Sequence, residues 1–311
     1  MNPEQTQELL SEETLEKEAL LFEYSQAADP IGSGKTPKVP IKQFLPEAYL
    51  FGKTVLASLD LSGELGVPYP ATSPSLLAGF AEIRGAESLA TSPDATSQLL
   101  YVIEGSGFTE TEWGAIPWRK GDILVLPGTA AVHRAEEDAR FYLVDDSPLL
   151  AYLGVTRLQG RFHPLLFRGE SIREALAKAQ ADPEAARRSR VSVLLANRQF
   201  PQTLTVTHCL WAMFGIILPG TRQKPHRHQS VALDFVVEGR PGVYTRVGGE
   251  LEADGSIRAP ARIDWVSSSA FVTPPGYWHE HVNESDGPAY ILPIQDAGLH
   301  TYLRTLDIRF T

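Results

Sequence analysis

The stretch Pro225-His226-Arg227-His228 contains the first of two His-x-His pairs in this chain. The second pair, His279 and His281, lies further along, just after the turn-forming run Pro274–Gly276. Residues two apart in a β-strand point to the same face, so each pair can direct two imidazoles into one cavity. Four histidines that converge from two strands outline a metal site, and they require a fold built largely from strands.

Composition limits the class of protein. The 311 residues suit two domains, and 43% hydrophobic with 21% charged residues is ordinary for a globular protein. The net charge of -10 argues against nucleic acid or an anionic membrane as a partner. A single cysteine, Cys209, excludes an intrachain disulfide. With no signal-peptide pattern and no apolar run of membrane-spanning length, we expect a cytoplasmic protein.

The pattern along the chain predicts an all-β fold with short helices. We expect an N-terminal helical arm over residues 1–39 and a strand-rich domain over 40–165. A connector rich in helix-forming residues covers 166–189, and a second strand-rich domain covers 190–311. In both domains short apolar runs alternate with turn residues, which is typical of antiparallel sandwiches and barrels.

The two strand-rich domains repeat each other. Phe235–Gly239 repeats the pattern of Tyr101–Gly105, and Val272–Gly276 repeats that of Val125–Gly128. Such self-similarity indicates an internal duplication. We therefore expect two small β-barrels, each with a mouth.

Two spaced motifs resemble the cupin superfamily. Gly220–His228 reads as a glycine, five residues and His-x-His, and Pro274–His279 reads as Pro-x-Gly-x-x-His. The resemblance implies two cupin barrels (double-stranded β-helix, or jelly-roll, barrels), which together make a bicupin.

The second half has a closer resemblance. Its segments Arg190–Asn197, Leu210–Ala212, His226–Gly239 and Trp278–Asn283 are similar to gentisate 1,2-dioxygenases and related salicylate-type ring-cleaving enzymes. This resemblance implies a mononuclear, non-haem Fe(II) dioxygenase that acts with O₂ on a small hydroxylated, aromatic compound.

The chain departs from that family in two ways. The family places its metal in the first cupin barrel, whereas the histidines here lie in the second. The family also has an arginine after Ala-Leu, positioned for the substrate carboxylate, and this chain has Asp234 there. A reversed charge in a substrate pocket repels the anion that the family binds, so we expect altered substrate specificity.

We predict His226, His228 and His279 as the metal ligands. The glutamate that many cupins add is missing, since residues 231–233 are Val-Ala-Leu; the gentisate branch also lacks it and uses three histidines. Imidazole suits Fe(II), which we favour, and also Mn, Ni, Zn or Cu. The alternative is a set of ordinary histidines near a barrel mouth.

Five further residues are candidates for roles beside the metal. His281 and Asp234 are predicted catalytic residues, because His281 can change charge near neutrality and Asp234 can act as a base. Arg190, Trp211, Gln229 and Asp234 are predicted to bind substrate. The alternatives are a histidine that only hydrogen-bonds at the pocket wall, an aspartate paired with an arginine, and a tryptophan in the core.

The first barrel lacks these ligands. Its third ligand position falls on Ala131, and only His133, which matches His281, remains. One histidine cannot hold a transition metal tightly. We expect a degenerate, structural barrel, with a metal-free ligand pocket as the alternative.

Two other functions remain open at this point. One is non-redox metal chemistry, as in an isomerase, hydrolase or lyase that uses the metal as a Lewis acid. The other is a cupin that binds a metabolite without turnover. We expect a homodimer or higher homo-oligomer, because barrels with exposed edges usually pair.

Overall fold

The computed structural model describes residues 11–184, 188 and 190–311. The chain divides into two compact units, Met1–Lys38 and Val39–Thr311. In the described part of the first unit, the expected arm contains two short helices, α1 (Glu12–Lys17) and α2 (Tyr24–Ala27). Within the described residues, no helix has the length and apolar character needed to cross a membrane.

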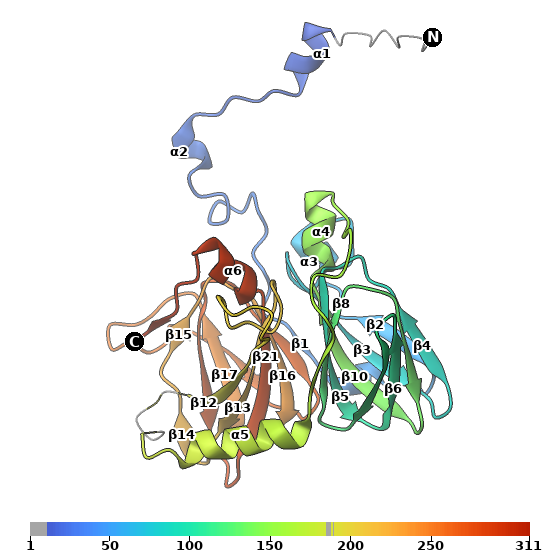
Figure 1. Cartoon of the computed structure of the whole chain (residues 1–311). Coiled ribbons are helices and arrows are strands. Elements are labelled where there is room, and N and C mark those ends of the chain that lie inside the picture. Colours follow the sequence, from blue (N-terminus) through green and yellow to red (C-terminus); the bar gives the residue numbers. More distant parts are fainter. Residues whose placement is uncertain (1–10, 185–187, 189) are drawn as a thin grey trace, which may run out of the picture. The chain divides into compact units, whose positions relative to one another are not determined.

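The second unit contains two β-barrels, and the first is built from two antiparallel sheets (Figure 1). Its elements are η1 (Pro46–Tyr49), β2 (Val55–Ser58), α3 (Ser62–Leu65), β3 (Leu77–Ile83), β4 (Ser88–Thr91), β5 (Ser97–Glu104), β6 (Ser106–Thr111), β7 (Gly114–Arg119), β8 (Ile123–Pro127), β9 (Ala131–Ala135), β10 (Ala139–Asp145), α4 (Ser147–Leu153) and β11 (Leu165–Phe167). The strands are ordered β11-β8-β5-β10-β3-β2 in one sheet and β4-β9-β6-β7 in the other.

A second barrel repeats this plan. Its elements are β1 (Gln43–Phe44), β12 (Val191–Leu195), β13 (Trp211–Ile217), β14 (Thr221–Arg222), β15 (His226–Arg227), β16 (Ala232–Glu238), β17 (Val243–Gly248), β18 (Ala261–Asp264), β19 (Ala270–Thr273), β20 (Trp278–Asn283), β21 (Ala289–Gln295), α6 (Ala297–Leu303) and β22 (Arg309–Phe310). One sheet is ordered β1-β19-β16-β21-β13-β12 and the other β18-β17-β20-β15-β22, with β14 also on β20. The all-β fold predicted from the sequence is confirmed.

The domain boundaries differ from the sequence expectation at two places. Strand β1, at the start of the expected first domain 40–165, pairs with β19 of the second barrel. Strand β11 reaches into the expected connector 166–189 and pairs with β8 of the first barrel. Both are edge strands, which satisfy backbone groups that the sheet would otherwise leave unpaired. Helix α5 (Gly169–Ala181) occupies most of the described connector.

Each barrel has its own apolar interior, and a third cluster joins the two. Trp118 and Phe141 lie in the interior of the first barrel, and Trp265 lies in that of the second. Between the barrels, the ring of Phe235 stacks on Tyr142 with centroids 4.7 Å apart. Phe235 is fully buried there, in one cluster with residues of both barrels.

We predict that Phe235→Ala destabilises the chain by about 3–5 kcal/mol, because it removes a buried ring that both barrels contact. Urea unfolding measures the change. The matched control is Phe51→Ala at an exposed position, expected to cost less than about 1 kcal/mol. Equal losses in the two variants would contradict the joining role of Phe235.

Candidate metal centre in the second barrel

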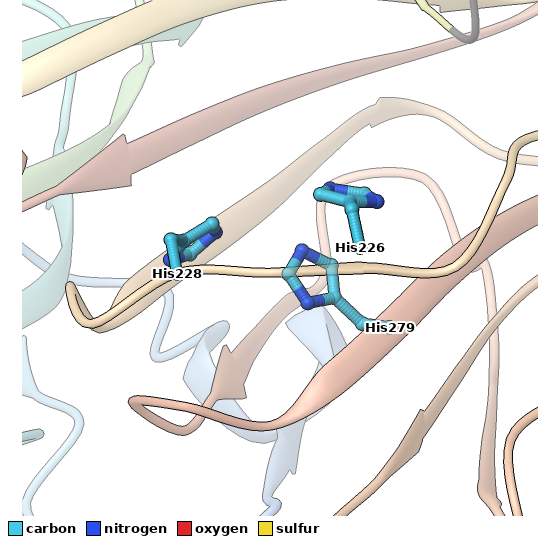
Figure 2. A group of neighbouring side chains, drawn as sticks. All are labelled: His226, His228 and His279. Carbon is cyan, nitrogen blue, oxygen red and sulfur yellow. The ribbon is translucent and has the colours of Figure 1, made fainter. Parts of the chain in front are cut away.

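Three histidines meet in the second barrel. His226 on β15 lies opposite His279 on β20 in the strand register, and His228 follows two residues after His226. One ring nitrogen from each of the three lies within 4.8 Å of the others, and all three residues are buried. Figure 2 shows the three rings gathered around one point. The predicted ligand positions are thus brought together.

Backbone carbonyls set the orientation of each ring. Nδ1 lies 3.2 Å from the Lys224 carbonyl oxygen in His226, 2.9 Å from that of Ser230 in His228, and 3.1 Å from that of Tyr277 in His279. A carbonyl oxygen only accepts, so Nδ1 carries the proton and Nε2 keeps its lone pair in all three. This is the pattern of histidines that ligate a metal through Nε2.

The donor set fits a transition metal. Nε2 of His228 is buried and has no hydrogen-bond partner within the described part of the chain. Burial lowers the pKa of His228 to about 4 and holds the pKa values of His226 and His279 well below their ordinary value. The three rings are therefore neutral at pH 7, which is the form that binds a metal.

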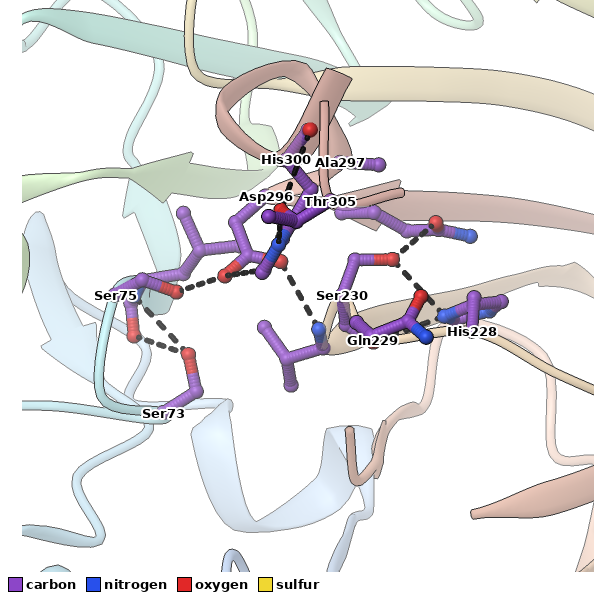
Figure 3. A network of polar contacts seen from close by, with 12 residues as sticks. Ser73, Ser75, His228, Gln229, Ser230, Asp296, Ala297, His300 and Thr305 are labelled. Atoms are coloured by element: carbon purple, nitrogen blue, oxygen red, sulfur yellow. Dashed lines mark hydrogen bonds and ion pairs between the residues drawn. The ribbon is translucent and has the colours of Figure 1, made fainter. Parts of the chain in front are cut away.

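A polar network connects His228 to the first barrel (Figure 3). The Ser230 hydroxyl lies 2.9 Å from Nδ1 of His228 and donates to Gln295 at 3.0 Å. The adjacent Asp296 accepts from the backbone N–H of Val231 at 2.9 Å and from the Ser75 hydroxyl at 2.6 Å. Ser75 belongs to the first barrel, so that barrel helps to position the loop that carries His228.

His281 has a different environment from His279. Its Nδ1 lies 2.8 Å from the Thr245 hydroxyl, which also accepts from the indole N–H of Trp265 at 2.8 Å. Burial lowers the pKa of His281 well below its ordinary value. The sequence argument expected a ring that changes charge near neutrality, whereas this buried ring stays neutral at pH 7.

The first barrel repeats this arrangement. Nδ1 of His133 lies 2.9 Å from the Thr109 hydroxyl, which accepts from the indole N–H of Trp118 at 3.0 Å. Thr91 occupies the place of His226, because it lies opposite Ala131 as His226 lies opposite His279. The Trp-Thr-His arrangement thus persists in a barrel without the ligand triad, which assigns it a role in the fold.

Arg190 supplies positive charge beside the triad. It precedes β12, and its guanidinium donates to Nε2 of His226 at 2.8 Å and to the sulfur of Met213 at 3.0 Å. Burial lowers the pKa of Arg190, and the charge of Asp234 raises it. Arg188, the other arginine of this stretch, is exposed and pairs with Asp182.

Asp234 faces the interior of the second barrel. It lies two residues before Val236, which belongs to the interior cluster, and it accepts from the Thr273 hydroxyl at 2.7 Å. Burial raises its pKa to about 6, against the lowering effects of Thr273 and Arg190. At pH 7 the carboxyl is mostly ionised, at a cost in stability.

The two remaining residues that were predicted to bind substrate, Trp211 and Gln229, have different environments. Trp211 is on the same face of β13 as the interior residue Ile217, and its indole N–H is buried with no partner among the described residues. Gln229 is exposed, and its side-chain oxygen accepts from the backbone N–H of Asp307. Adjacent residues of an extended chain point in opposite directions, so Gln229 points away from the buried triad while His228 points into it.

The C-terminal strand is a contact that sequence reasoning missed. Strand β22 pairs with β15, and the ring of Phe310 stacks on His226 with centroids 5.5 Å apart. Phe310 is otherwise half exposed. A two-residue strand carries no periodic signal, so nothing in the sequence pattern could have placed it beside the ligands.

Comparison with solved structures shows the fold that this chain shares with known proteins. Salicylate 1,2-dioxygenase from Pseudaminobacter salicylatoxidans superposes with a TM-score of 0.73 over 96% of this chain and 95% of that one, at 14% identity. At this identity the likeness concerns the fold. The chain has the fold of a bicupin, with two barrels in one chain, as its motifs indicated.

Curated relatives narrow the resemblance. Gentisate 1,2 dioxygenase 1 from Aquipseudomonas alcaligenes is 33% identical over 133 residues, which are 43% of this chain and 35% of that protein. A 5-aminosalicylate 1,2-dioxygenase from Comamonas sp. is 31% identical over 129 residues, or 40% of this chain and 31% of that protein. The match thus spans about a third of the length of these relatives. No family model matches the chain.

The raised pKa of Asp234 predicts a pH-dependent effect of Asp234→Asn. A pKa of about 6 in the folded chain, above its ordinary 3.8, means that the wild type loses stability as pH rises through this range. Asparagine does not ionise, so the variant should gain about 2 kcal/mol relative to wild type between about pH 4.5 and pH 7.5.

Urea unfolding of metal-free protein at several pH values measures this gain. Asp264→Asn, at an exposed aspartate paired with Arg262, is the matched control and should show no such gain. A difference for Asp234→Asn that does not change with pH would contradict the burial of an ionised carboxylate.

Proposed function

We propose that the second barrel is the active site of an Fe(II)-dependent, ring-cleaving dioxygenase that acts on a small hydroxylated aromatic carboxylate. The observation that carries this proposal is the convergence of three neutral imidazoles, with Nδ1 of each held by a carbonyl, beside a partly buried arginine. The relatives named for gentisate and 5-aminosalicylate support it. Fe(II), held by His226, His228 and His279, would supply the redox chemistry for cleavage by O₂.

Arg190 is the proposed anchor for the substrate carboxylate. Its guanidinium lies beside His226, close to where a substrate bound at the triad would present its acid group. A planar guanidinium matches a carboxylate with two parallel hydrogen bonds. Because the same guanidinium donates to Nε2 of His226, metal binding would release it from the histidine and make it available to the anion.

Asp234 is the proposed determinant of specificity. Its ionised carboxyl accepts hydrogen bonds and disfavours a second acid group nearby. A substrate with an amino or hydroxyl substituent would satisfy it. The indole N–H of Trp211 could donate to a substrate oxygen, since it has no partner among the described residues. His281 would form part of the wall, and Gln229 is left out because it is exposed.

Anaerobic reconstitution tests the proposed function. Metal-free protein is loaded with Fe(II), Mn, Ni, Zn or Cu, and oxygen uptake is followed with gentisate, salicylate and 5-aminosalicylate. We expect uptake with Fe(II) only, one iron per chain, and loss of both in His279→Ala. His163→Ala, at an exposed histidine of the first barrel, is the matched control and should keep both. Turnover without O₂ would favour the non-redox alternative, and binding without turnover a metabolite-binding protein.

The proposed anchor predicts a separate kinetic effect. Arg190→Gln should raise KM for a carboxylate substrate roughly 10- to 100-fold, with a smaller change in kcat, because it removes a charge-assisted hydrogen bond. Arg190→Lys should recover part of the loss. Arg188→Gln, two residues earlier and exposed, is the control. An unchanged KM in Arg190→Gln at full iron content would contradict the anchoring role.

A further inference from the structure

The mouth of the first barrel holds a cavity of about 310 Å³. Its lining continues the inner face of the barrel beyond the packed interior. Leu143 and Leu100 belong to the interior cluster, and Asp145 and Gln98, two residues further along their strands on the same face, line the cavity. The volume lies in the range of small-molecule sites.

This cavity lies at the position that corresponds to the histidine triad of the second barrel. Thr91, at the place of His226, lies on its wall. Asp145 is followed by Asp146, and Gln295 by Asp296. Asp146 accepts from the backbone N–H of Ser97 at the start of β5, and Asp296 accepts from that of Val231 just before β16. Asp145 in the first barrel therefore corresponds to Gln295 in the second, and Gln295 accepts from Ser230, the serine beside His228. The first barrel thus has a cavity at this position, but its lining lacks the three histidines.

The chemistry of the lining is that of a site for a cation. Asp145 accepts hydrogen bonds from the backbone N–H of Ser147 at 2.9 Å and from the Ser147 side chain, and it forms no ion pair within the described part of the chain. A second carboxylate, Asp94, lies on the wall, and the lining includes no lysine, arginine or histidine. Burial raises the pKa of Asp145 to about 6, so the carboxyl is mostly ionised at pH 7 and lacks a counter-charge.

The residues that line the cavity favour an organic cation over a metal ion. Among the described residues, the group that could hold a metal ion is the histidine triad of the second barrel. The two carboxylates of this cavity would give a divalent metal ion few ligands. Ser58, Ser92 and Gln98 add neutral polar groups, while Leu56 and Leu77 offer apolar wall. A short carbon chain with a charged end matches this combination.

We propose that the mouth of the first barrel binds a small primary amine, whose ammonium group pairs with the carboxylate of Asp145. The ammonium supplies the missing counter-charge, and its other N–H groups donate to the serine and glutamine oxygens of the wall. The site is separate from the triad and does not depend on the function proposed for it. The first barrel thus acts as a binding module beside the metal barrel.

Calorimetric titration of the full chain tests the proposal. Ethanolamine, butylamine and 1,4-diaminobutane are the probes, and ethylene glycol and glycolate are the neutral and anionic controls. We expect saturable binding of at least one amine and none of the controls. Asp145→Asn should weaken amine binding at least about tenfold, since it removes the charge but keeps the shape. Asp264→Asn, at an exposed aspartate of the second barrel, should leave it unchanged.

Two further variants keep the result interpretable. Ser58→Trp fills the mouth from an exposed position, which spares the core, and should abolish amine binding even if Asp145→Asn fails to fold. His279→Ala should bind amines as the wild type does, which separates this site from the metal centre. The proposal is overturned if no probe binds, or if Ser58→Trp binds amines as tightly as the wild type.

Discussion

Successive side chains of strand β16 (Ala232–Glu238) point to opposite faces of the sheet, and both barrels depend on this alternation. On one face Phe235 packs against aromatic rings of the first barrel, and on the other Asp234 points into the second barrel. Because alternation in a strand has period two, a shift of register by one residue would bury the carboxylate between the barrels and send the ring into the metal pocket. The packing that joins the barrels therefore also fixes the direction of the charge at the site.

The two barrels differ at the ligand positions but share one buried polar arrangement. Both keep a tryptophan that donates to a threonine, which contacts a histidine, as in Trp265, Thr245 and His281. These buried polar groups satisfy one another, so removing one would leave the others unpaired. The metal-ligand positions are not part of this set of mutually satisfied polar groups. The second barrel has three imidazoles at these positions, and the first has a threonine and an alanine at two of them.

The sequence predicted the fold and the convergence of His226, His228 and His279, because spaced motifs and period two encode both. Asp234, which was assigned to the substrate pocket from the sequence, faces the interior of the second barrel. The sequence did not predict strand β1 in the second barrel, or the contact of Ser75 with Asp296, which joins residues 221 positions apart. Such pairings depend on how finished barrels meet, and short edge strands leave no periodic trace. Gln229 was predicted to bind substrate because it follows His228 in the sequence. Since His228 points inward, strand alternation already implied that the Gln229 side chain points outward.

Charge balance connects the site to the kind of molecule it would accept. The three imidazoles are neutral, and the opposite charges of Arg190 and Asp234 offset each other. A divalent metal ion would add two uncompensated positive charges in a buried space, where water screens them poorly. An aromatic carboxylate with an ionised phenol would supply two negative charges, whereas a neutral diol supplies none until it loses its protons. We infer that the pocket favours dianionic chelating substrates, and that Asp234 disfavours any third negative group.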